Sequence, residues 1–141
     1  MFKARAPLWL AALWWGSLTT VGFGVVPLLF THLPTPAVAG AMAAKLFSAQ
    51  TWLSTICGLV LLALSRQEGE GAAALKAAAM PILGGMLLAL LSEFAVAPRI
   101  VARENLALWH SVGSGMYLLQ WVCSAAVLWK LTDSAGARSS S

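Results

Sequence analysis

Five polar side chains lie at the ends of apolar segments, where they could bind a charged ligand. Glu93, Arg99, Arg103 and His110 fall between the third and fourth segments, and His32 ends the first. Arginine binds carboxylates and anions through paired N–H donors, and a carboxylate left unpaired at a membrane edge is costly. The pattern predicts one polar cluster at the outer face, in which Glu93 pairs with Arg99 or Arg103.

Three interpretations of this cluster stay open. The polar groups could only cap helices and pair at the water boundary, they could bind a small anion or lipid headgroup, or His32 and His110 could hold haem or a metal ion. The chain shows no nucleophile–base pair, no metal-spaced Cys/His set and no glycine-rich phosphate loop. We therefore expect no catalytic residues, no enzyme activity, no metal site and no cofactor, with the histidine site as the alternative.

Two further polar side chains, Tyr117 and Gln120, lie deeper in the last segment. Gln120 is expected to form hydrogen bonds between helices, and a polar permeation path is the alternative. Pro98 disfavours helical geometry at the residue before it, so one helix should end near Val96 and the next should begin with Pro98. If that helix continues to Trp129, one of its sides carries Arg99, Arg103, His110, Tyr117 and Trp121.

The composition places the chain in the membrane class. Of 141 residues, 60% are hydrophobic and 10% are charged, whereas soluble domains carry about 25% charged residues. The formal net charge is +4, but the nine basic residues are scattered and mostly flank apolar segments. This distribution argues against nucleic acid as a partner and indicates the lipid bilayer instead.

The segments that must position these side chains predict an all-α, up-and-down bundle of four transmembrane helices. Their approximate bounds are 7–30, 46–65, 73–96 and 106–129, and the second and fourth helices extend beyond the membrane on the outer side. Thr35 is the expected N-cap of the second helix and Pro36 its first residue. Residues 1–131 form one domain, and 132–141 are predicted to be a short, disordered polar tail.

Small residues at helical spacing predict faces where helices approach closely, because packing rather than hydrophobic burial drives association in lipid. The second segment has a weakly polar face of this kind. The residues assigned to close packing are Gly16, Thr20, Gly24, Gly85, Ser111 and Gly115, and the weakly polar face comprises Ser48, Thr51, Thr55 and Gly58. The two halves share a plan, but no repeat strong enough to indicate duplication is evident.

The charges flanking the segments predict the orientation. Six basic residues fall on the face with the amino terminus (Lys3, Arg5, Arg66, Lys76, Lys130 and Arg138) and three on the other (Lys45, Arg99 and Arg103). Cytoplasmic loops carry the excess of Lys and Arg. We expect a multi-pass protein of the bacterial cytoplasmic membrane with both termini in the cytoplasm.

Several short motifs resemble those of the four-helix membrane proteins related to transmembrane protein 205, whose bacterial members form a domain-of-unknown-function family. They are Trp15-Gly16, Phe23 with Pro27 and Phe30, Lys45-Leu46-Phe47, Pro98-Arg99-Ile100 and Leu108-Trp109-His110-Ser111. The resemblance covers about residues 7–130 and implies four membrane helices without an established activity. Glu93 departs from the pattern, because an amide or small polar residue is more common there.

These observations favour a small non-enzymatic accessory or scaffold component, with another membrane protein or further copies of the chain as partners. Two alternatives stay open. The first is an oligomeric transporter or channel for a small solute or anion. The second is a membrane protein that binds haem or a metal ion.

Overall fold

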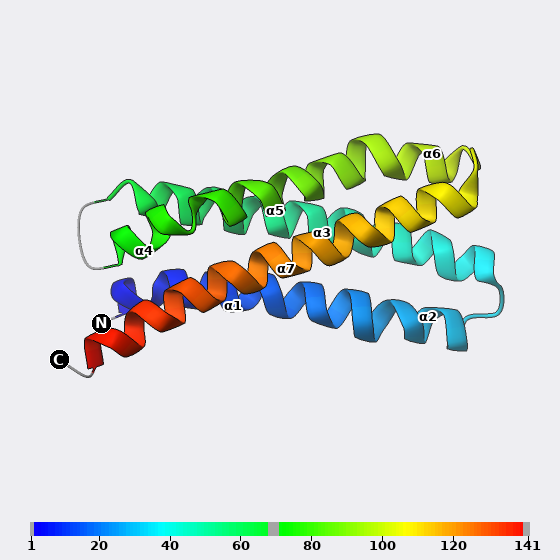
Figure 1. Ribbon diagram of the computed structural model, residues 1–141. Coiled ribbons are helices and arrows are strands. Elements are labelled where there is room, and N and C mark those ends of the chain that lie inside the picture. Colours follow the sequence, from blue (N-terminus) through cyan, green and yellow to red (C-terminus); the bar gives the residue numbers. More distant parts are fainter. Residues whose placement is uncertain (1, 68–70, 140–141) are drawn as a thin grey trace.

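The computed structural model describes residues 2–67 and 71–139, and every element in these ranges is a helix. The helices form an up-and-down bundle of four membrane-length segments (Figure 1). Both termini lie at one end of the bundle, here called the terminal end. The turns at 33–35 and 102–105 form the opposite end, called the distal end. The predicted all-α, four-helix architecture is confirmed.

The four segments differ in how regular they are. The second and fourth are single helices, α3 (Pro36–Ser65) and α7 (Leu106–Ser139). The first consists of α1 (Phe2–Thr19), the π-helical segment η1 (Thr20–Val25) and α2 (Val26–His32). The third consists of α4 (Ala72–Ala77), α5 (Ala79–Leu91), the π-helical segment η2 (Ser92–Val96) and α6 (Ala97–Val101).

Each segment is long and apolar enough to cross a membrane. The four stretches have mean hydropathy values of 1.3 to 1.8 and cover Arg5–His32, Pro36–Ser65, Ala79–Val101 and Leu106–Ala137. A hydrocarbon core about 30 Å thick needs about 20 helical residues. The chain is therefore a multi-pass membrane protein.

The two distal turns end their helices in different ways. At the first, the Thr35 side chain accepts a hydrogen bond from the Val38 N–H at 3.3 Å, so the predicted N-cap is confirmed. At the second, the chain does not turn at Pro98 as predicted. It continues through α6 and turns at 102–105, where Arg103 and Asn105 have positive φ angles of 56° and 38°.

The π-helical segment η2 explains why Pro98 does not end the third segment. A proline ring clashes with the carbonyl four residues earlier in a regular α-helix. Here the Ala97 N–H bonds to the Ser92 carbonyl, five residues back, and this wider turn accommodates the ring. Arg99 and Arg103 therefore do not share a helix with His110, Tyr117 and Trp121, and the predicted stripe along one helix is absent.

The polar carboxy-terminal stretch also differs from its prediction, because α7 continues to Ser139. Thr132 and Ser134 bond to backbone carbonyls of their own helix, at Trp129 (2.8 Å) and Leu131 (3.0 Å). This back-bonding satisfies hydroxyls inside a helix. Alanines at 135 and 137 add helix propensity.

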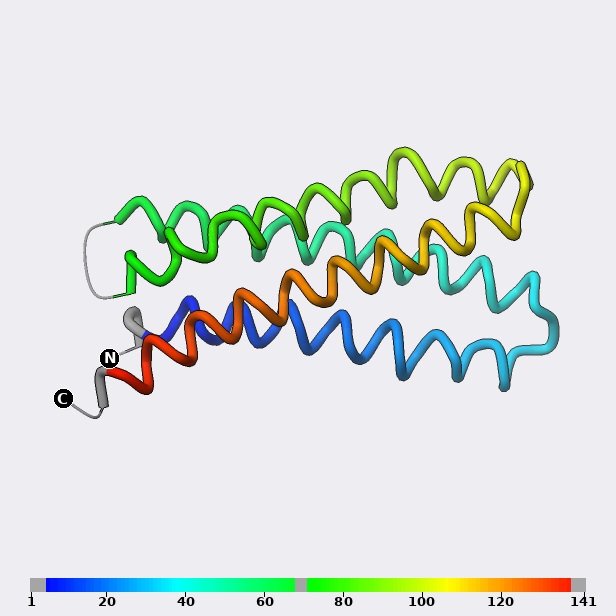
Figure 2. The backbone as a smooth tube through the Cα atoms, viewed as in Figure 1, coloured from blue at the N-terminus to red at the C-terminus, as the bar shows by residue number. Residues whose placement is uncertain are grey.

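The helices pack in the cyclic order α1, α3, α5, α7, so each contacts its two neighbours (Figure 2). Trp14 on α1 is fully buried and reaches the diagonal helix, where Gly85 of α5 faces its ring. The other diagonal is bridged by Phe47 of α3 and Tyr117 of α7, whose ring centroids are 5.3 Å apart. Large side chains thus fill the centre of the bundle.

The two halves carry a residue-level repeat that the sequence analysis did not recognise. Each π-helical segment ends at the valine of a Phe-x-Val-x-Pro motif, which spans 23–27 and again 94–98. The second helix of each half carries Gln-x-x-x-Ser, at 50–54 and 120–124, and all four of these side chains are buried. The halves run in the same direction and share these motifs as well as the plan.

Candidate functional site

A layer of polar side chains lies inside the bundle, midway along the helices. Gln50 of α3 donates from Nε2 to Ser17 Oγ of α1 at 3.0 Å and to Ser54 Oγ at 3.3 Å. Ser54 Oγ in turn donates to Gln120 Oε1 of α7 at 3.4 Å. Gln50 and Gln120 are each only 4% exposed. This layer joins three helices through hydrogen bonds that lipid cannot replace.

Glu93 lies on the distal side of this layer, at the interface between η2 and α3. Its Oε1 accepts a hydrogen bond from Ser48 Oγ at 2.7 Å. One turn away, Thr51 Oγ1 donates to the Ala89 carbonyl at 3.4 Å, a long distance for an O–H···O bond. The predicted pairing of Glu93 with Arg99 or Arg103 is replaced by a serine from another helix.

The arginines and histidines of the predicted cluster stay at the distal end and are exposed. Arg99 lies over the Trp109 ring, with its guanidinium carbon 4.6 Å from the ring centroid. His32 Nδ1 is 3.0 Å from the Leu28 carbonyl and 2.7 Å from Thr31 Oγ1. Arg103 lies in the turn and His110 on the exposed side of α7. Glu93 precedes Arg99 by almost two turns, which separates them by about 9 Å along the axis.

In the first half of the chain, the Tyr117 ring occupies the space that corresponds to the Glu93 side chain in the second half. Its hydroxyl donates to the Leu18 carbonyl at 2.7 Å, just before η1. The Tyr117 ring fills the space next to Gly22, where any Cβ would overlap it. Leu18 and Ala89 are equivalent positions, so in each half a hydroxyl from the other half reaches the carbonyl ahead of the π-helical segment.

Replacing Tyr117 with phenylalanine should lower the free energy of unfolding by about 1 kcal/mol, because an interhelical hydrogen bond is lost while the ring contacts remain. Unfolding by sodium dodecyl sulfate in mixed micelles, followed by circular dichroism, measures the change. Thr132→Ala is the control, because its hydroxyl is exposed and bonds only within α7. Equal stabilities of the wild type and Tyr117→Phe would contradict the assigned role of the hydroxyl.

The residues assigned to close packing divide into two groups. Gly85 is buried, and a Cβ there would lie 2.8 Å from the Trp14 ring. Gly16, Gly24 and Gly115 have no heavy atom within 4 Å of a Cβ built on them, and Thr20 and Ser111 are exposed. Of these residues, only Gly85 allows close packing inside the bundle, and the others face outward.

Sequence reasoning missed Gln50 and Ser54 and did not connect Ser48 or Thr51 with Glu93. The repeated Gln-x-x-x-Ser pattern was the available signal for the buried layer. The weakly polar face of α3 was recognised, and it does contact α5. Ser48 bonds to Glu93, Thr51 approaches Ala89, and Gly58 lies against Met86.

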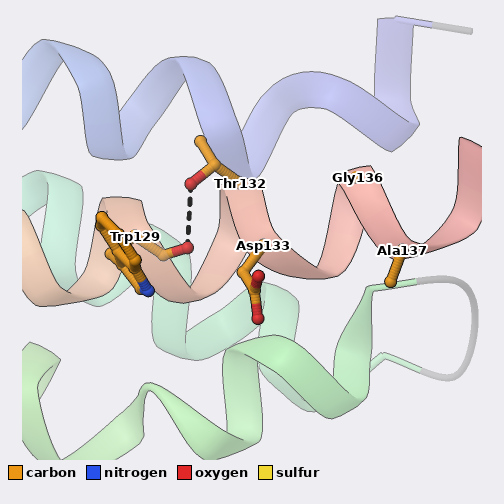
Figure 3. Close-up of a pocket in the computed structure, with 5 residues that line it drawn as sticks. All are labelled: Trp129, Thr132, Asp133, Gly136 and Ala137. Carbon is orange, nitrogen blue, oxygen red and sulfur yellow. Dashed lines mark hydrogen bonds between the residues drawn. The ribbon is translucent and has the colours of Figure 1, made fainter.

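A surface hollow near the terminal end lies apart from this layer (Figure 3). All its lining residues belong to α7: Trp129, Thr132, Asp133, Gly136 and Ala137. The hollow is open, and its one bond in Figure 3 joins Thr132 to the Trp129 carbonyl within the helix. We therefore place the candidate site at the interior polar layer and Glu93.

Comparison with known protein families identifies the family to which the chain is similar. The model of a family described as a domain of unknown function (DUF4149) matches residues 9–108. This range includes most of the first segment, all of the second and third, and the start of α7. No curated protein and no solved structure matches the chain.

Proposed function

Because this chain belongs to the DUF4149 family, whose description specifies no activity, we propose a function from the structure. In this proposal the protein is a small, non-enzymatic accessory or scaffold component of the membrane, and it binds a transmembrane helix of another protein. The proposal is supported mainly by one observation, the polar and small residues on the outward side of α7.

The outward side of α7 near the distal end differs from an ordinary lipid-facing surface. His110, Ser111, Ser114 and Gly115 are all exposed there, and nothing lies within 4 Å of a Cβ built on Gly115. Polar residues of membrane helices usually face other helices, and small residues let two backbones approach closely. A helix seated on this side would cover the hydroxyls and fill the open space beside Gly115.

Larger side chains on this side should abolish the association. We expect the double variant Ser111→Leu/Gly115→Leu to lose the partner that co-purifies at fixed stoichiometry with the wild type in mild detergent, because the added atoms hold the second helix away. Ala63→Leu, at a small residue of α3 that is also exposed, is the control and should retain the partner. The complex is measured by size-exclusion chromatography with light scattering.

Two outcomes would overturn this proposal. One is a double variant that retains the partner at the wild-type ratio. The other is a wild type that elutes as a single copy without any partner in every mild detergent tested. A complex that contains only this chain would assign the side of α7 to self-association instead.

The proposed location is the bacterial cytoplasmic membrane, with both termini in the cytoplasm. The charge distribution supports this orientation, because Arg5, Arg66, Lys76 and Lys130 lie near the terminal end. Lys45, Arg99 and Arg103 lie in the distal half.

A second candidate function is transport of a small solute by an oligomer. One observation favours it, namely that the Glu93 carboxylate lies within the membrane-length stretch Ala79–Val101. Ionisable groups at such positions commonly mark solute or ion pathways. Solute flux into proteoliposomes that is lost in Glu93→Gln would support transport, and equal flux in empty liposomes would exclude it.

A further inference from the structure

We propose that Glu93, Ser48, Thr51 and the Ala89 carbonyl form a binding site for an alkali-metal cation inside the bundle. All four groups present oxygen atoms at one interface, between α3 and the third segment. Alkali-metal cations bind oxygen ligands in the filters of channels and at membrane depth in transporters. The site goes beyond the accessory function proposed above and does not depend on it.

The first argument is the cost of the Glu93 charge. The carboxylate lies within Ala79–Val101, and no ion pair joins it to any residue in the described ranges. Lys45, one turn before Ser48 on α3, is exposed and forms no ion pair with it either. A charged side chain at membrane depth is costly and generally pairs with an opposite charge. A bound cation would supply the missing positive charge.

The second argument is the direction of the oxygen atoms. Ser48 and Thr51 are three residues apart and lie on one side of α3, and Ala89 and Glu93 are one turn apart on the facing helix. Helical side chains point toward the amino-terminal end, so the Glu93 side chain leans back over the turn of Ala89. The distances of 2.7 Å and 3.4 Å tie both hydroxyls to this same turn.

The third argument is the backbone around Glu93. The Ala97 N–H bonds five residues back in η2, and Pro98 provides no N–H at all. This turn therefore has fewer internal donors than an α-helical turn. Such single-turn π-helical segments occur often at functional sites. Irregular helical backbone at membrane depth binds cations through its carbonyl oxygens in transporters.

The fourth argument is the difference between the two halves. The position equivalent to Glu93 in η1 is Gly22, which the Tyr117 ring covers. In the first half an aromatic ring therefore fills the space beside the π-helical segment, whereas in the second half a carboxylate and two hydroxyl groups lie at the equivalent place. A purely structural repeat would not require the acid. A single positive charge balances the carboxylate, whereas a divalent cation would leave a net charge in the membrane.

Carbodiimide labelling of the full-length protein in detergent tests the site, because this apolar reagent modifies carboxyl groups at membrane depth. Mass spectrometry follows the modification of Glu93 at constant pH and ionic strength, with NaCl replacing choline chloride. We expect Na+ to slow the labelling of Glu93. Thr51→Ala should raise the Na+ concentration that gives half-protection by about tenfold or more, because one ligand is lost.

Thr55→Ala is the matched control, because its hydroxyl bonds only to the Thr51 carbonyl of its own helix. It should keep the wild-type protection, and Lys45→Met should do so as well. Na+ should also raise the melting temperature of the wild type but not that of Glu93→Gln, since a ligand stabilises only the state that binds it. Parallel titrations with Li+ and K+ identify the preferred ion.

The proposal is overturned if Na+, Li+ and K+ change neither the labelling rate nor the melting temperature of the wild type. Protection that appears only when Lys45 is replaced would identify the lysine as the counter-ion and also overturn it. A third outcome is that Na+ protects the other carboxyl groups, in the wild type and in Glu93→Gln alike, as strongly as it protects Glu93. This would show a general effect of salt and would also overturn the proposal.

Discussion

Replacing Trp14 with alanine is expected to lower the free energy of unfolding by about 3–5 kcal/mol, the largest effect of any single substitution considered. Trp14 has 0% exposure and crosses the bundle to the opposite helix, so its removal leaves a cavity at the centre. Its Nε1 has no hydrogen-bond partner in the described part of the chain. The ring therefore acts through its volume.

Trp9→Ala is the matched control for this measurement, because the same side chain is 67% exposed on the same helix. Denaturation in mixed micelles should show a change of no more than about 0.5 kcal/mol for this variant. Similar losses for the two tryptophans would contradict the packing described for α1. Trp14→Phe should fall between the wild type and Trp14→Ala.

Gly85→Ala is expected to cost about 1–3 kcal/mol, because the added methyl group has no room. The new Cβ would lie 2.8 Å and 2.9 Å from two atoms of the Trp14 ring and 3.4 Å from Cys123 Cβ. The indole is rigid and fully buried in the core, so it cannot move aside without disturbing its neighbours there. Thermal unfolding in detergent should show a lower melting temperature for this variant.

Alanine substitutions at two other glycines distinguish the effect of steric overlap from the general effect of alanine on helix stability. At Gly58 the new Cβ would meet the flexible end of Met86, which can change its rotamer, and at Gly16 it would meet nothing within 4 Å. Alanine also favours the helical state by up to about 1 kcal/mol relative to glycine. We expect Gly16→Ala to be neutral or stabilising and Gly58→Ala to lie between the two.

The sequence was sufficient to predict the architecture, because the signals for it are local. Four apolar stretches and a low charge content indicate membrane helices, and Thr35 followed by Pro36 specifies where α3 begins. The position of the second distal turn was not predictable in this way. Pro98 has the same local signature whether it starts a helix or follows a π-helical turn, and only the contacts around η2 decide between them.

The candidate site was harder to predict, because its partners come from distant parts of the chain. Glu93 was recognised as unusual, but the arginines close to it in sequence were the obvious counter-charges. The π-helical turn carries Glu93 toward α3 instead, where Ser48 bonds to it. Gln120 was singled out from the sequence, but Gln50 and Ser54, the other members of the interior layer, are recognisable only when the two halves are compared.

The most direct test of this account is the side of the membrane on which each end of the bundle lies. Single cysteines at Pro34, Gln67 or Glu104, in a chain whose Cys57 and Cys123 are replaced by alanine, can be labelled in sealed vesicles with a membrane-impermeant maleimide. The four-span bundle predicts that positions 34 and 104 are labelled from one side and position 67 only from the other. Labelling of positions 34 and 67 from the same side would contradict it.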